Sequence, residues 1–151
     1  MTAIANILLR DARPDDQIHL LLWDAPDRNE LIRIASYNNA IIVNYRENLL
    51  QRIDRNNSFL ALHQELDREL QAIKSICSGV SQQVVLLEGL DCLITYLQVH
   101  PDGRLTLFWN NLEKTRKLEK LIWILLPHQL APKNWNEARI KQLLPITRSS
   151  E

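Results

Sequence analysis

The chain contains four short runs of apolar residues, each bounded by polar or turn-forming residues. None of the runs alternates between apolar and polar positions. A strand of a parallel sheet is covered by helices on both faces, so its sequence is a nearly continuous apolar run. The pattern therefore predicts four buried strands of a parallel sheet: Ile18–Trp23, Ala40–Val43, Val84–Leu87 and Leu121–Leu126.

The segments between these runs carry apolar residues three or four positions apart, which is the periodicity of a helix. The longest stripe follows Ser58, a good N-cap residue, and continues to Cys77, with Glu69 on the opposite, polar face. The other predicted helices are Thr2–Leu9, Asp27–Tyr37, Glu47–Ile53, a helix from Asp102 to Lys117, and Trp135–Leu143 with Asn134 as its cap.

Strands that alternate with helices indicate an α/β fold built from strand–helix–strand units. We expect a three-layer α/β/α sandwich with a mainly parallel sheet of four to five strands, in which Pro145–Thr147 would be the fifth. No linker, repeat or low-complexity segment interrupts the chain. Residues 1–147 are therefore predicted to form one domain, followed by a flexible tail at residues 148–151.

Charge and composition narrow the classes of function. Eighteen basic residues balance eighteen acidic ones, so no general attraction draws the chain to nucleic acid or to an anionic membrane. Cys77 and Cys92 each lie in an apolar run and are expected to be reduced core thiols. No signal peptide or membrane-spanning run is recognisable, which predicts a cytoplasmic protein without a membrane partner. Low net charge also favours a protein partner or a homo-oligomer.

Acidic residues follow the first and third predicted strands. Asp24 comes directly after the first strand, whereas Glu88 and Asp91 follow the third. We expect these three to approach one another at the carboxyl edge of the sheet if the two strands are neighbours. They form a candidate acidic site, which a divalent ion could occupy in one interpretation; in the other they are helix caps and ion-pair partners.

Tryptophan and basic residues supply the remaining candidates. Trp109 and Trp135 belong either to the core or to an exposed interface. Lys114, Arg116, Lys117 and Lys120 form the densest basic stretch, which is either a solvated helix end or a patch that contacts phosphate. The four histidines are scattered, and no metal or other cofactor is predicted.

Three segments follow one another in the order of a nucleotide-binding domain. Leu20–Pro26 is a strand with a turn, Val84–Asp91 has apolar residues followed by the acid Glu88, and Leu121–Pro127 is another buried strand. In this order the chain resembles a degenerate P-loop ATPase domain of the AAA-like group. Glu88 matches the Walker B acid, but the Gly, Lys and Ser/Thr of the phosphate loop have no counterparts. The resemblance implies an ATPase fold that has lost its ATPase chemistry.

Three functions are compatible with these patterns, and no catalytic residue is predicted. The favoured hypothesis is a non-catalytic protein-interaction module, an adaptor, regulatory or assembly subunit with a pseudo-ATPase fold. The second is a metal-dependent enzyme that uses the acidic site. The third is a nucleic-acid-binding accessory protein that uses the basic stretch together with Arg139 and Lys141.

Overall fold

The centre of the molecule is a five-stranded sheet in which all strands are parallel, with the order β2-β3-β4-β1-β5. The computed structural model describes residues 8–9, 18–52, 66–99, 104–115, 118, 120–133, 135 and 137–143. The strands are β1 (Ile18–Trp23), β2 (Ala40–Asn44), β3 (Val84–Glu88), β4 (Leu121–Leu126) and β5 (Ile140–Leu143). The four strands predicted from apolar runs are thus confirmed, two of them one residue longer than predicted.

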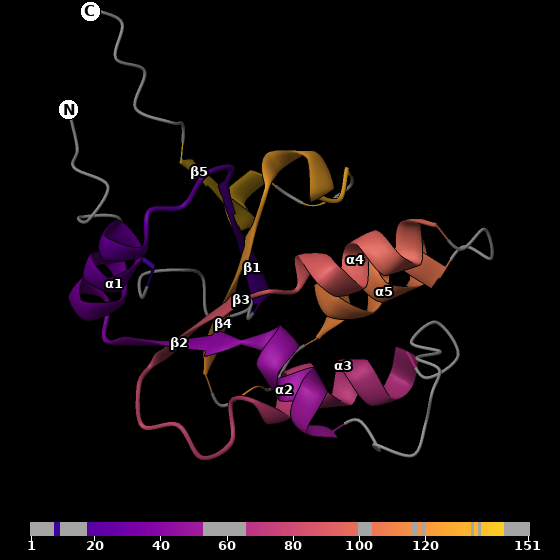
Figure 1. Ribbon diagram of the computed structural model, residues 1–151, viewed down its shortest axis with the longest axis horizontal. Helices are drawn as coiled ribbons and strands as arrows, with labels where there is room; N and C mark the ends of the chain where they lie inside the picture. The colour runs from indigo at the N-terminus through magenta and orange to yellow at the C-terminus, as the bar shows by residue number, and fades with distance from the viewer. Residues whose placement is uncertain are drawn as a thin grey trace, which may run out of the picture.

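Helices cover both faces of the sheet, but unequally. Helix α1 lies on one face, and the other four helices lie on the opposite face (Figure 1). Their bounds are α1 (Arg28–Tyr37), α2 (Tyr45–Arg52), α3 (Leu66–Ser75), α4 (Asp91–Gln98) and α5 (Arg104–Lys114). The predicted three-layer α/β/α architecture is confirmed.

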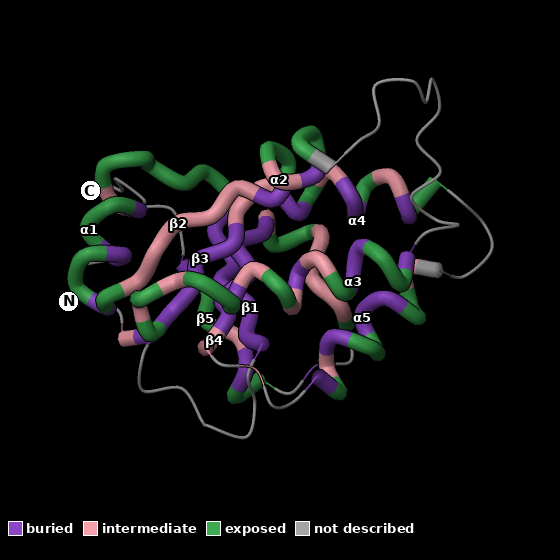
Figure 2. The backbone as a smooth tube through the Cα atoms, turned by 90° about the horizontal axis from the view of Figure 1, so that it is seen from below, coloured by how far each residue is buried: buried purple, intermediate pink, exposed green. Residues whose placement is uncertain are grey.

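Alternate residues of each central strand enter two separate hydrophobic cores. In β3, Val85 and Leu87 pack among α2–α5, whereas Val84 and Leu86 pack on the side of α1. Successive side chains of a strand point to opposite faces, so an unbroken apolar run supplies both cores at once. Buried residues accordingly gather along the middle strands, while the outer faces of the helices are exposed (Figure 2).

Helix α1 forms as its sequence predicts. The Asp27 side chain accepts a hydrogen bond from the Asn29 backbone N–H at 2.9 Å and caps the helix, and Leu31 and Ile34 are buried against the sheet. Asn38 ends the helix with a fully buried amide. Its Nδ2 donates to the Ile34 carbonyl at 2.9 Å, and its Oδ1 accepts from the Leu9 N–H at 2.7 Å. One side chain thus ties the helix end to Leu9.

The predicted helix Trp135–Leu143 is wrong. Residues Glu137–Arg139 form a single 3₁₀ turn, and Ile140–Leu143 is the edge strand β5, which pairs with β1 from Leu20↔Ile140 to Trp23↔Leu143. A spacing of three between apolar residues suits a helix, but pairing with β1 satisfies more backbone groups. This tertiary pairing outweighs the local preference.

The predicted exposure of Glu69 is also wrong. Glu69 is fully buried on α3, and the Tyr45 hydroxyl donates to its Oε1 at 2.5 Å. Tyr45 begins α2, 24 residues earlier, and is itself fully buried. The pairing of a buried carboxylate with a hydroxyl from another helix could not be read from the stripe of α3 alone.

Several predictions fall on residues outside the described ranges. These are the helix start at Ser58, the cap at Asp102, the cap at Asn134, the strand Pro145–Thr147, the tail at residues 148–151, and most of the helix Thr2–Leu9, of which the described Leu8 and Leu9 are not helical. Where the helix after Asp102 is described, it ends at Lys114 and not at Lys117. Within the described residues, no helix combines the length and the apolar character that crossing a bilayer requires.

Candidate functional site

A pocket of about 410 Å³ opens at the carboxyl edge of the sheet, where β1, β2, β3 and β4 end. At this edge the chain leaves the sheet in two directions. After β1 it continues into α1 on one face, whereas after β3 it continues into α4 on the other face. Such a divergence leaves a crevice, and ligands of open α/β sheets usually bind there. Asp24, Glu88 and Asp91 all line this pocket, so the three acids do share one place. However, β1 and β3 are not neighbours, because β4 lies between them.

A salt bridge joins Glu88, which lines the pocket, to Arg28 at the start of α1. Arg28 Nη1, in the first turn of α1, donates to Glu88 Oε2 at 2.8 Å and to Oε1 at 3.1 Å. The hydrogen bond and charge of Glu88 raise the pKa of Arg28. The Arg28 side chain is 61% exposed, so solvent screening limits the pair to about 1 kcal/mol of stability. The contact therefore positions and neutralises Glu88 more than it stabilises the fold.

The two acids that follow β1 both accept hydrogen bonds from backbone N–H groups. Asp24 Oδ1 accepts a hydrogen bond from the His128 N–H at 2.7 Å, which joins the turn after β1 to the 3₁₀ turn His128–Leu130 after β4. Asp27 caps α1. The ion-pair interpretation of Glu88 is therefore confirmed. The predicted helix cap at Asp91 is wrong, because Leu90 occupies the N-cap position of α4 and Asp91 is the exposed first residue of the helix. Among the described residues, no three His, Cys, Asp or Glu side chains lie close enough together to hold a metal ion.

The floor of the pocket depends on a glycine. Gly89 follows β3 with φ +83°, and a Cβ atom there would lie 3.0 Å from Asn44 Oδ1 and 3.2 Å from the Arg46 backbone nitrogen. Asn44 Oδ1 already accepts from the Glu47 N–H at 3.0 Å and so caps α2. The close approach lets the ends of β2 and β3 meet α2 without a side chain between them.

Replacing Gly89 by alanine should destabilise the protein by about 2–4 kcal/mol, because a positive φ costs an L-residue about 1–2 kcal/mol and the Cβ would displace the α2 cap. Gly79→Ala is a matched control: its φ is +89°, but a Cβ there would meet nothing within 4 Å. Urea unfolding of both variants separates strain from contact. Equal losses in the two variants would show that the approach to Asn44 and Arg46 has no energetic weight.

Cys92 lines the same pocket but is not an activated nucleophile. Burial, and secondly the charge of Asp91, raise the pKa of the Cys92 thiol. A thiol of raised pKa stays protonated at neutral pH, and the protonated form is unreactive. Cys77 and Cys92 are both free cysteines. Cys77 is buried in the core as predicted, whereas Cys92 is only half-buried.

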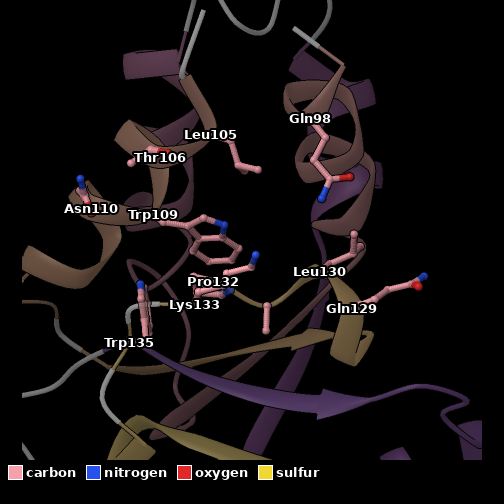
Figure 3. Close-up of a pocket in the computed structure, with 11 residues that line it drawn as sticks. Gln98, Leu105, Thr106, Trp109, Asn110, Gln129, Leu130, Pro132, Lys133 and Trp135 are labelled. Carbon is pink, nitrogen blue, oxygen red and sulfur yellow. The ribbon is translucent and has the colours of Figure 1, made fainter. Parts of the chain in front are cut away.

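A second pocket, of about 360 Å³, lies between α4, α5 and the segment that follows β4 (Figure 3). Trp109 and Trp135 line it, but they are only 6% and 7% exposed, so the core interpretation of both residues holds. Their rings meet edge to face with centroids 5.6 Å apart. The Arg139 guanidinium lies over the Trp135 ring at 4.3 Å.

Arg139 is a structural residue and not part of a basic surface. It is 3% exposed, and its guanidinium donates to the carbonyls of Ile18 and Glu113. This overturns its proposed place in a nucleic-acid patch. In the basic stretch, Lys114 is exposed and Lys120 is half-buried, whereas Arg116 and Lys117 lie outside the described residues.

The sequence signals for these sites differ in kind. The position of the acids directly after strands predicts their place at the carboxyl edge. Their partners leave no local pattern, because Arg28 lies 60 residues from Glu88 and the His128 N–H lies 104 residues from Asp24. For the second pocket, the sequence indicates only the two tryptophans of its lining. No model of a protein family matches the chain, and comparisons with curated proteins and with solved structures likewise found no match.

Proposed function

We propose that this protein is a non-catalytic protein-interaction module, an adaptor, regulatory or assembly subunit. The observation that carries the proposal is the outer edge of β2, which ends the sheet. All five residues of Ala40–Asn44 are half-buried, and none is charged or proline. Natural edge strands that avoid pairing usually carry lysine, proline or a bulge. An uncharged apolar edge is instead suited to accept a strand from another chain.

The helices before and after β2 in the sequence carry further exposed apolar side chains. Tyr37, at the end of α1, is 44% exposed, and Leu50, in α2, is 60% exposed. The two helices lie on opposite faces of the sheet. Exposed apolar side chains therefore occur on both helices that flank β2 in the sequence, and burial of apolar surface drives association.

The carboxyl-edge pocket supports the non-catalytic part of the proposal. Glu88 is paired with Arg28, Asp24 accepts a backbone hydrogen bond, and burial raises the pKa of the Cys92 thiol, which favours its protonated form. A reacting group must be able to gain or lose a proton, ligate a metal or attack a substrate. These three side chains are engaged in other contacts or in the wrong protonation state for that work.

A degenerate P-loop ATPase-like fold is part of this proposal. The strand order supports it, because β4 separates β1 from β3, and an intervening strand between the phosphate-loop strand and the Walker B strand is a feature of the AAA-like group. The turn after β1, Asp24–Asp27, contains no glycine or lysine to cradle a phosphate. The argument from strand order is one of fold analogy, so it bears on ancestry more than on activity. We also propose a cytoplasmic location, a compartment in which free cysteines such as Cys77 and Cys92 stay reduced.

The test is light scattering over a range of protein concentrations, joined to capture of partners by the immobilised full chain. We expect self-association or a partner of defined stoichiometry, and loss of either in Ile42→Lys, which places a charge in the β2 edge. Leu107→Lys is the control, because it changes charge equally at an exposed apolar residue of α5, outside the β2 surface. A monomer at all concentrations that also captures nothing would contradict the interaction role.

Titration with Mg²⁺ and ATP tests the non-catalytic role separately. We expect no saturable heat, because the turn after β1 offers carboxylates where phosphate would need amide donors and a cation. Tight binding of ATP at Asp24–Arg28 would overturn this half of the proposal.

A further inference from the structure

The pocket between α4 and α5 is separate from the carboxyl-edge pocket, and the two share no lining residue. Its volume of about 360 Å³ falls within the size range of small-molecule sites. One side is formed by α5 and Trp135, and the other by Gln98 at the end of α4 and by Gln129 (Figure 3). The pocket plays no part in the proposed interaction at β2.

Flat apolar groups form much of the lining. The indoles of Trp109 and Trp135 are nearly perpendicular, at 81°, and Pro132 and Leu130 lie close by on the segment after β4. Figure 3 shows the Trp109 ring directed into the space above Pro132 and Lys133. Aromatic rings prefer edge-to-face or offset contacts with other rings, so this corner suits a planar ring of one or two cycles.

The charge on the described lining of the pocket is positive. Among the described residues that line it, Lys133 is the charged one, and its other polar groups are amides and a hydroxyl. Leu105 and Thr106 bring the first turn of α5 to the pocket, and this turn contains no acidic residue. A helix N-terminus carries a partial positive charge, which adds to that of Lys133. The combined field favours an anion.

We propose that this pocket binds a small aromatic carboxylate. The ring packs against Trp109, Trp135 and Pro132, and the carboxylate pairs with Lys133. The amide of Gln98 is placed to recognise a polar substituent on the ring. A neutral aromatic ligand would leave Lys133 without a counter-charge. A carboxylate without a ring would leave the apolar corner of the pocket unfilled. The ring alone and the carboxylate alone are therefore each expected to bind weakly.

Nuclear magnetic resonance of the full chain tests the proposal, because each of the four tryptophans gives one indole N–H signal. The probes are 2-naphthoate, its neutral analogue 2-naphthalenemethanol, and acetate. We expect 2-naphthoate to shift the signals of Trp109 and Trp135 saturably and to leave those of Trp23 and Trp123 in place. The alcohol should bind about tenfold more weakly, since one charge-assisted contact is worth about that factor.

Lys133→Met supplies the decisive comparison. Lys133 is exposed, so its replacement keeps the fold. It should weaken 2-naphthoate about tenfold and leave the alcohol unchanged, whereas Lys141→Met, at an exposed lysine of β5, should change neither. Three results would overturn the proposal: no shift of the Trp109 and Trp135 signals, equal shifts of all four tryptophans, or equal affinity for 2-naphthoate and its alcohol.

Discussion

Replacing Arg139 by alanine is expected to lower the free energy of unfolding by about 3–5 kcal/mol, because it removes the donors of two buried carbonyls at once. Nε and Nη2 of Arg139 both donate to the Ile18 carbonyl, at 3.1 and 2.7 Å, and Nη1 donates to the Glu113 carbonyl at 3.0 Å. Arg139 directly precedes β5, so its side chain joins this strand to the start of β1 and to the end of α5. Without it, β5 loses its anchor on β1 and Trp135 loses the cation over its ring.

Two variants separate the contributions to this effect. Arg139→Lys keeps the charge but cannot reproduce a planar fork of donors, so about half of the loss should remain. Lys141→Ala, two residues further on and exposed, should change stability by less than about 0.5 kcal/mol. Urea unfolding followed by circular dichroism measures all three. A loss below about 1 kcal/mol for Arg139→Ala would mean that the two carbonyls find other donors.

Trp123→Ala is expected to cost a similar amount, about 3–5 kcal/mol, by opening a cavity in the middle strand of the sheet. Trp123 is 1% exposed and stacks on His19 of β1, with ring centroids 4.7 Å apart. Its Nε1 donates to the Leu9 carbonyl at 3.0 Å. Leu9 is fully buried, and its own N–H donates to Asn38, so Trp123 and Asn38 together hold Leu9 in place.

Trp123→Phe isolates the hydrogen bond from the packing. Phenylalanine retains most of the apolar contact but leaves the Leu9 carbonyl without this donor, for an expected loss of about 1–3 kcal/mol. Thermal unfolding of both variants gives the comparison, and proteolysis near Leu9 reports whether the segment is released. If the two variants lose the same stability, packing is not the main contribution of Trp123 and the cavity argument fails.

The candidate site could be predicted in part. Position after a strand was enough to select Asp24, Glu88 and Asp91, because carboxyl ends of parallel strands share one edge. What these acids do was not predictable, since Arg28 reaches Glu88 across β4 and the His128 N–H reaches Asp24 from the end of the neighbouring strand β4. Contacts between residues this distant depend on strand order, which hydrophobic patterns do not encode.

Local physics determined the layered fold. Continuous apolar runs became buried parallel strands, and the spacing of Leu31 and Ile34 became the inner face of α1, because both patterns depend on neighbouring residues. Tertiary structure decided the rest. Ile140–Leu143 became a strand and not a helix because β1 offered an unpaired edge, and Glu69 and Arg139 became buried because groups distant in sequence supplied their hydrogen bonds. A polar side chain is buried only where the whole fold brings it a partner, and no local pattern contains that information.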